Sequence, residues 1–185
     1  WQVNAHTPAG PLAFRLAVAG RHNVRNALAA ATCALAVGVP LDAIGRGLEA
    51  FEPVKGRSRA LSLNLGGHAL TVVDDSYNAN PDSVRAAIEV LAELPAPRLL
   101  VLGDMGEVGE EGPGFHAEVG ALARDRGLEQ VFTLGTLAEH VARQCPAARH
   151  FSDMPDLLAA VQDALPGVAS VVVKGSRFMK MERVV

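Results

Sequence analysis

The sequence predicts an α/β fold in which a Rossmann-like, mostly parallel sheet is flanked by helices. One observation is the alternation, between about residues 68 and 174, of apolar runs with segments of helical periodicity. Such alternation is typical of βαβ units around a parallel sheet. A second is the run from Leu99 to Leu102, which contains only Leu and Val. A run of this kind indicates a central strand that is covered on both faces.

The second and larger part of the chain is expected to contain six strands and four helices. Strands at 59–65 and 68–74 flank Gly66-Gly67, and glycines suit the positive φ angles of a tight hairpin turn. Helices are predicted at 81–94, 113–126, 136–144 and 155–165, and the remaining strands at 98–102, 130–134, 149–151 and 169–174. Right-handed crossovers would then put the loops that follow the strands on one edge of the sheet.

The first part of the chain follows a different pattern. Residues 1–11 indicate no strong element, residues 12–19 alternate like a half-buried strand, and helices are predicted at 23–37 and 41–51. That strand is expected to belong to a sheet whose other strands are absent, which would leave an exposed edge. The segment Glu52-Pro53-Val54-Lys55-Gly56-Arg57 has the composition of a linker. We therefore predict two domains, residues 1–56 and 57–185.

Composition excludes some classes of function. The 185 residues carry a formal net charge of -3, and the arginines are scattered, which argues against nucleic acid as the main partner. No apolar run reaches the length of about 18 residues that a membrane span requires. Cys33 and Cys145 lie on alanine-rich helical patterns and are expected to be buried thiols, which fits a cytoplasmic protein. The histidine spacing indicates no metal site. Because the first residue is Trp1, we expect a fragment of a longer protein.

Polar turns follow three of the predicted strands and are expected to share one rim of the sheet. They are Asp74-Asp75-Ser76, Gly103-Asp104-Met105-Gly106-Glu107 and Lys174-Gly175-Ser176-Arg177. Open α/β sheets bind ligands at this edge. Asp75 could equally be a helix N-cap, and the cations at 174 and 177 could either face solvent or bind a carboxylate or phosphate at a predicted helix N-terminus. The glycine-rich run from 103 to 114 lacks the spacing of a dinucleotide fingerprint or a P-loop.

Asn23 and Asn26 lie one helical turn apart in the first part of the chain, next to His22. An amide side chain offers both a donor and an acceptor, which suits the edge of an adenine, although capping is the commoner role of Asn. Both interpretations stay open on the residues alone.

Four motifs, spread from Gly20 to the end of the chain, resemble the Mur ligase family. They are Gly20-Arg21-His22-Asn23-Val24-Arg25-Asn26-Ala27-Leu28-Ala29-Ala30, Asp74-Asp75-Ser76-Tyr77-Asn78-Ala79-Asn80-Pro81, Leu102-Gly103-Asp104-Met105 and Val173-Lys174-Gly175-Ser176-Arg177. The resemblance implies an ATP-dependent amide ligase of peptidoglycan synthesis, with residues 1–56 from the end of a central ATP-binding domain and 57–185 from the C-terminal domain. The second and fourth motifs most resemble the members that join D-Ala-D-Ala to UDP-N-acetylmuramoyl-tripeptide through an acyl phosphate.

The resemblance also implies roles for individual residues, while the catalytic residues stay unassigned. The nucleotide-binding set contains the two asparagines that would face the adenine, an arginine at the linker and an aspartate that would contact the ribose: His22, Asn23, Asn26, Arg57 and Asp75. The side where the dipeptide or the peptide carboxylate sits would be lined by Asn78, Asn80, Lys174, Ser176 and Arg177. Closure about the linker is expected to bring Asp75 toward Asn23 and Asn26.

The family's phosphate loop, Mg²⁺ ligands and carbamylated lysine are expected upstream of Trp1, so the chain alone is expected to be inactive. The expected protein is a cytoplasmic monomer with small-molecule substrates. Two other functions stay open. A folylpolyglutamate-type ligase or another Mur ligase would use a different acceptor, and a non-catalytic nucleotide-binding or interaction module would use the sheet alone.

Overall fold

The computed structural model describes residues 1–185 and divides the chain into two compact units, Trp1–Val54 and Lys55–Val185. Each unit has a sheet and a hydrophobic core of its own. The division falls inside the segment whose composition indicates a linker. None of the helices has the combination of length and apolar character that crossing a membrane requires.

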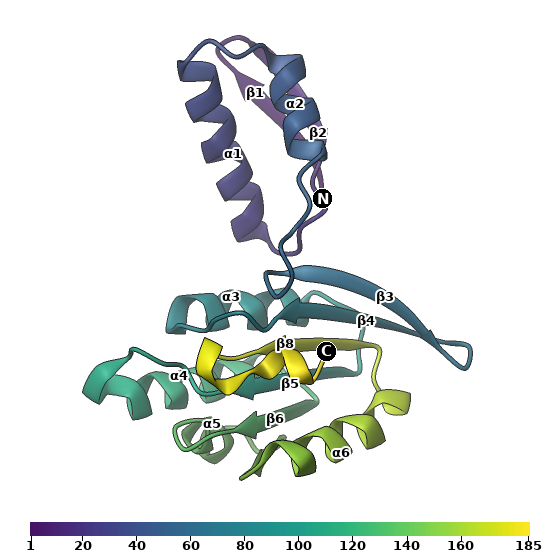
Figure 1. Ribbon diagram of the computed structural model, residues 1–185, viewed down its shortest axis with the longest axis vertical. Helices are drawn as coiled ribbons and strands as arrows, with labels where there is room; N and C mark the ends of the chain where they lie inside the picture. Colours follow the sequence, from purple (N-terminus) through teal and green to yellow (C-terminus); the bar gives the residue numbers. More distant parts are fainter. The chain divides into compact units, whose positions relative to one another are not determined.

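The first unit is a two-stranded antiparallel hairpin with two helices (Figure 1). Its elements are β1 (Gln2–Thr7), β2 (Gly10–Arg15), α1 (Arg21–Ala36) and α2 (Leu41–Glu49). The core combines Leu12 and Phe14 of β2 with Ala27 and Ala31 of α1 and Ile44 of α2. The alternation in β2 thus predicted its buried face correctly.

Four expectations for the first unit are wrong. Residues 2–7 form β1, which pairs with the whole of β2, so the predicted strand has a partner within the chain. In β1 only Val3 is buried, which leaves no apolar alternation to detect. The strand also ends at Arg15 rather than Ala19, and Gly20, at φ 94°, precedes α1. Cys33 is exposed on α1, whereas Cys145 is buried as predicted.

The second unit is built on the predicted mostly parallel sheet, which has six strands in the order β3-β4-β8-β5-β6-β7. Only β3 is antiparallel to its neighbour β4. The strands are β3 (Arg59–Leu65), β4 (His68–Asp75), β5 (Arg98–Gly103), β6 (Gln130–Leu134), β7 (Ala148–Phe151) and β8 (Ser170–Lys174). The apolar residues Leu99 to Leu102 of β5 are fully buried, as a central strand requires.

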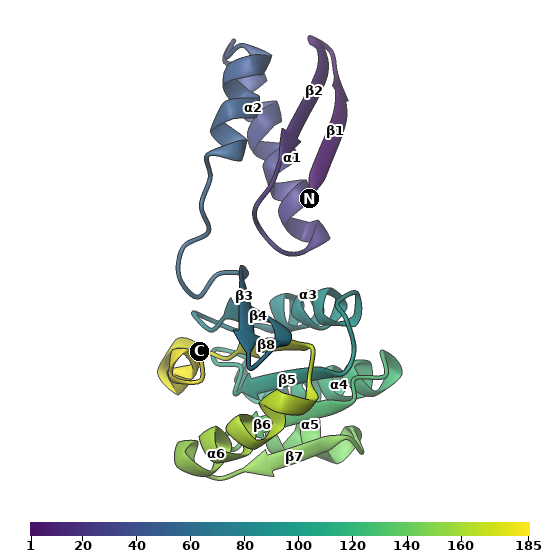
Figure 2. The same ribbon diagram turned by 90° about the vertical axis from the view of Figure 1, so that its right-hand side faces the viewer.

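Helices cover both faces of this sheet (Figure 2). One face carries α3 (Pro81–Ala92), α4 (Gly112–Asp125) and α5 (Glu139–Gln144), and the other carries α6 (Met154–Ala164). The chain steps outward from β4 through β5 and β6 to β7, then returns through α6 to insert β8 between β4 and β5. Because right-handed crossovers in opposite directions place helices on opposite faces, this strand order accounts for the layers.

The predicted helix after β8 is wrong. The chain instead forms two 3₁₀ turns, Arg177–Met179 and Met181–Arg183. Lys180 between them has φ 52°, a left-handed conformation that interrupts a helix. The second turn buries Met181 against the face of the sheet that α6 also covers. The rim beyond β8 is therefore closed by a tight turn rather than by a helix N-terminus.

Candidate functional site

The three polar turns do share one rim, formed by the C-terminal ends of β4, β8 and β5. The parallel register pairs Asp75 of β4 with Lys174 of β8, and Lys174 in turn with Leu102 of β5. Because β8 is the central member, its last residue lies between the two other turns. The rim is where the sequence predicted a binding site.

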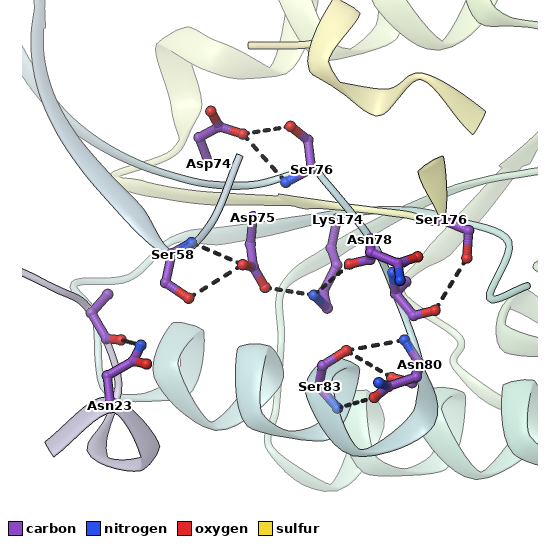
Figure 3. Close-up of polar contacts among 12 residues, drawn as sticks. Asn23, Ser58, Asp74, Asp75, Ser76, Asn78, Asn80, Ser83, Lys174 and Ser176 are labelled. Carbon is purple, nitrogen blue, oxygen red and sulfur yellow. Dashed lines mark hydrogen bonds and ion pairs between the residues drawn. The ribbon is translucent and has the colours of Figure 1, made fainter. Parts of the chain in front are cut away.

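Asp75 forms the centre of the polar contacts at this rim (Figure 3). Its Oδ2 lies 2.6 Å from the ammonium of Lys174, and its Oδ1 accepts hydrogen bonds from the backbone N–H and the hydroxyl of Ser58 at 2.8 and 3.2 Å. The carboxylate is not a helix cap, because no hydrogen bond joins it to the first turn of α3. Three donors from two other segments hold it in place instead.

Asp74, the neighbouring acid, has a structural role. The side chain is 1% exposed, and Oδ2 accepts the N–H of Gly56 at 2.9 Å while Oδ1 accepts the hydroxyl of Ser76 at 2.5 Å. Gly56 also accepts the N–H of Tyr77. Gly56 has φ 80°, and a Cβ there would lie 3.1 Å from Tyr77, so only glycine suits this position. These bonds tie the linker end to the turn after β4.

Lys174 is buried, which changes the role that the sequence suggested for it. The side chain is 2% exposed, and the ammonium donates to Asp75 and to the backbone carbonyl of Asn78 at 2.9 Å. Asn78 is exposed, and its side-chain oxygen accepts the N–H of Ala79. The lysine therefore supports the turn from beneath the surface that a ligand would reach.

Ser176 joins all three turns. Its hydroxyl donates to the carbonyl of Ala79 at 3.1 Å and accepts the N–H of Gly106 at 2.5 Å, and its N–H donates to the carbonyl of Asp104 at 3.0 Å. The side chain is 3% exposed. Asp104 is also buried and accepts the N–H of Ala138 ahead of α5. Like Lys174, Ser176 fixes the rim from within.

Arg57 and Arg177 bring two positive charges to one exposed aromatic ring. The guanidinium carbon of Arg57 lies 4.2 Å from the centre of the Tyr77 ring, and that of Arg177 lies 5.6 Å from it. Arg177 also pairs with Glu182 at 2.9 Å. Contacts with the ring stabilise each cation, but the two cations repel each other. An anion such as a phosphate or a carboxylate would relieve that repulsion.

Asn80 is the N-cap of α3. Its side-chain oxygen accepts the N–H of Ser83 at 2.8 Å, and the Ser83 hydroxyl accepts the N–H of Asn80 at 3.0 Å, which makes a reciprocal capping box. Pro81 follows at the first helical position. The capping function is thus taken by Asn80, and its side-chain amide N–H groups make no bond within this box.

The remaining predicted residues lie at the start of α1 in the first unit. Asn23 donates from Nδ2 to the carbonyl of Ala19 at 2.7 Å and accepts from Nδ2 of Asn26 at 3.3 Å. Gly20 is the N-cap, so neither asparagine caps α1. Asn26 is exposed, and His22 and Asn23 are partly exposed. The two asparagines form one connected pair of amides on the helix surface.

Sequence reasoning missed two contributors to the rim. Ser58 supplies two of the donors to Asp75, yet nothing in its sequence context marks it as a site residue. Gly106 supplies a backbone N–H to Ser176. A Cβ at this position would lie 2.9 Å from the Phe178 ring, so the presence of glycine in the turn from Gly103 to Glu107 was the available signal.

Residues 56–177 match the family described as the glutamate ligase domain of the Mur ligases. This match spans more than half of the chain. The chain belongs to the Mur ligase family. The family resemblance drawn from the four motifs is therefore confirmed.

Two curated Mur ligases illustrate the degree of similarity. The UDP-N-acetylmuramoyl-tripeptide--D-alanyl-D-alanine ligase of Escherichia coli (strain K12) is 40% identical over 186 aligned positions, which cover 100% of this chain and 40% of that protein. The ligase of the same name from Bacillus subtilis (strain 168) is 32% identical and is covered to 39%, with 93% of this chain aligned. The chain thus spans about 40% of the length of these relatives.

Solved Mur ligase structures share the fold. MurF from Acinetobacter baumannii superposes with a TM-score of 0.88 at 34% identity, covering 99% of this chain and 40% of that one. MurF from Thermotoga maritima, solved in complex with ADP, gives a TM-score of 0.83 at 25% identity, covering 99% of this chain and 42% of that one. The α/β fold predicted from the sequence is confirmed by these matches.

The chain holds no group of three or more His, Cys, Asp or Glu side chains that could bind a metal ion. Asp75, the most accessible aspartate of the rim, already pairs with an ammonium. The acids of the rim therefore do not fit a magnesium site by themselves.

Proposed function

We propose that the chain is part of an ATP-dependent amide ligase that joins D-Ala-D-Ala to UDP-N-acetylmuramoyl-tripeptide in peptidoglycan synthesis. The observation that carries this proposal is the 40% identity, over the whole chain, to a ligase named for that reaction. The Tyr77-Asn78-Ala79-Asn80 turn and the Lys174-to-Arg177 turn support it, because the structure places them side by side on one rim.

The reaction makes definite demands on a protein. ATP phosphorylates the carboxylate of the tripeptide, the amine of D-Ala-D-Ala attacks the acyl phosphate, and the tetrahedral intermediate then loses phosphate. Such chemistry requires cations near the transferred phosphoryl group and a site that keeps water from the acyl phosphate. Mg²⁺, when bound, would neutralise part of the triphosphate charge. The proposal assigns no magnesium ligand to this chain.

Residues of the predicted nucleotide-binding set still have hydrogen-bonding capacity. Asp75 would accept a ribose hydroxyl, because its Oδ2 has one lone pair beyond the bond from Lys174. Asn26 keeps its side-chain oxygen and one amide hydrogen after bonding to Asn23, so it can both donate to and accept from an adenine edge. His22 is adjacent to this pair. Arg57 would face a phosphate.

The acceptor side would use the exposed members of the second set. Arg177, Asn78 and Asn80 are exposed and can contact a peptide carboxylate or amide directly. Lys174 and Ser176 are buried and would act by holding this surface in shape. This division refines the roles that the family resemblance implied for the five residues. ATP and a UDP-linked substrate are small cytoplasmic metabolites, so we place the protein in the cytoplasm. The expectation that it is a monomer stays a proposal.

An assay of the full-length protein that carries this chain tests the proposal. Phosphate release from ATP in the presence of UDP-N-acetylmuramoyl-tripeptide should depend on D-Ala-D-Ala and should not be supported by glutamate, single amino acids or folate acceptors. A mass increase equal to D-Ala-D-Ala minus water should appear on the tripeptide substrate. Activity with a different acceptor would replace the proposal by another ligase of the same fold. Absence of ATP-dependent ligation with every acceptor would favour a non-catalytic module.

A further inference from the structure

His116 of α4 is a fully buried imidazole with a hydrogen bond at each nitrogen. Nε2 lies 2.9 Å from the backbone nitrogen of Met105, and Nδ1 lies 2.7 Å from the carbonyl oxygen of Gly112. A backbone N–H can only donate and a carbonyl can only accept, so Nε2 must be the bare nitrogen and Nδ1 must carry the proton. The contacts thus select one neutral tautomer of the ring.

The two bonds close the segment between Met105 and Gly112, which begins within the turn after β5. The residue after Met105 is Gly106, whose N–H donates to the hydroxyl of Ser176. The same hydroxyl donates to the carbonyl of Ala79, which lies between Asn78 and Asn80. A chain of direct hydrogen bonds and adjacent peptide units therefore leads from His116 to the exposed asparagines of the rim.

We propose that His116 is a positioning residue for the acceptor side of the site: its neutral ring holds the turn after β5 so that Gly106 orients Ser176 and, through it, the Asn78–Asn80 turn. This inference rests on the proposed ligase function. His116 itself contacts no substrate, and its influence passes through backbone groups. An apolar residue of similar size would leave the Met105 N–H buried without a partner.

The surroundings of the ring favour the neutral form. Burial lowers the pKa of His116, and the nearby His140 lowers it further, whereas the Gly112 carbonyl and the Asp104 carboxylate act in the opposite direction. Burial is the largest of these causes. A proton on Nε2 would oppose the Met105 N–H, so protonation and the observed turn are incompatible.

Two substitutions in the full-length protein separate positioning from packing. In His116→Gln the longer amide can place its oxygen near the position of Nε2 and accept the Met105 N–H. In His116→Asn the amide is too short to reach Met105 but can still donate to Gly112 within the helix. The two amides are equally polar, so the Met105 contact is the main difference between them. Steady-state kinetics would be measured with ATP, the tripeptide substrate and D-Ala-D-Ala varied in turn.

We expect His116→Asn to raise the KM for D-Ala-D-Ala or for the tripeptide about tenfold, with the KM for ATP changed less than about twofold, and His116→Gln to recover most of the loss. Equal kinetics for wild type and His116→Asn would overturn the inference while leaving the ligase function intact. Equal rises in all three KM values would also overturn it, because they would indicate a general loss of structure. Lack of ligase activity in the wild type would instead contradict the proposed function.

A measurement on the unmutated protein covers the case in which neither variant folds. Selective ¹⁵N labelling of histidine distinguishes a protonated ring from each neutral tautomer by the two nitrogen shifts. The inference requires His116 to show the Nδ1–H tautomer at neutral pH. A protonated ring or the Nε2–H tautomer would contradict it.

Discussion

Lys174 Nζ lies 2.6 Å from Oδ2 of Asp75, in a pair whose lysine side chain is 2% exposed and whose aspartate side chain is 17% exposed. The two residues are register partners at the ends of adjacent parallel strands. A buried ammonium is costly unless acceptors replace its water, and here Asp75 and the Asn78 carbonyl do so. The pair thus connects the fold of the sheet to the proposed nucleotide-binding carboxylate.

Removal of the ammonium should destabilise the second unit. We expect Lys174→Met to lower the free energy of unfolding by about 3 kcal/mol, because Asp75 is left without its charged partner. The double variant Lys174→Met with Asp75→Asn should lose less than the sum of the single variants, because it leaves no unpaired charge. Urea denaturation of all three variants measures the coupling. Lys180→Met, at an exposed lysine, is the control. Additive losses would show that the two side chains do not stabilise each other.

Asp75 should contribute one hydrogen bond to the nucleotide. Two of its lone pairs accept donors from Ser58 and one accepts Lys174, which leaves one of about four for a ligand. In the full-length protein, Asp75→Ala should raise the KM for ATP or lower turnover by a factor that corresponds to about 1 to 3 kcal/mol of lost binding or transition-state free energy. Of 2′-deoxy-ATP and 3′-deoxy-ATP, only the analogue that lacks the hydroxyl bound by Asp75 should bind to the wild type more weakly than ATP does. That analogue should bind to Asp75→Ala as tightly as it binds to the wild type. Unchanged kinetics in Asp75→Ala would remove this residue from the site.

Two substitutions at Asn80 separate its capping role from a contact with the substrate. Asn80→Ala should cost about 1 kcal/mol of stability, because the Ser83 N–H loses its acceptor. Asn80→Asp keeps the capping oxygen and should be as stable as the wild type, since an acid is favoured at a helix N-terminus. If the amide of Asn80 donates to the substrate, Asn80→Asp should still raise the KM for D-Ala-D-Ala. Thermal denaturation and kinetics on both variants distinguish the roles, and normal kinetics in Asn80→Asp would leave capping as the only one.

The sheet of the second unit could be predicted because its strands have strong local signals. The buried run at Leu99–Leu102 and the glycine pair at 66 and 67 give the central strand and the hairpin directly. β1 could not be predicted, because only Val3 on it is buried and its stability depends on pairing with β2. The absence of a helix after β8 also lacked a signal, because neither the left-handed conformation of Lys180 nor the burial of Met181 beside it can be recognised from the local sequence.

The candidate site could be predicted in position but not in the orientation of its side chains. Strand order places the three turns on one rim, and parallel βαβ topology follows from the sequence. Whether Lys174 faces solvent or the interior depends on its neighbours in space, and β8 becomes central only through the return of the chain past α6. The role of His116 also depends on a neighbour in space, the backbone N–H of Met105, which lies eleven residues earlier in the chain.

The pH dependence of stability should report the neutral state of His116. Burial keeps its folded pKa below the unfolded value of about 6.5, so between these two values the unfolded chain binds more protons than the folded one. Its contribution to stability is therefore fully present above about pH 7 and is lost as the pH falls through this window, by at most about 1.4 kcal/mol per pH unit. The carboxyls with lowered pKa values, such as Glu129 beside Arg98, lose their contribution only at lower pH.

Urea denaturation between about pH 5 and 7 should thus show a free energy of unfolding that depends more steeply on pH in the wild type than in His116→Gln, whose amide has no group to protonate in this range. Equal slopes would mean that His116 takes up a proton in the folded protein as readily as in the unfolded chain, which its two hydrogen bonds do not allow.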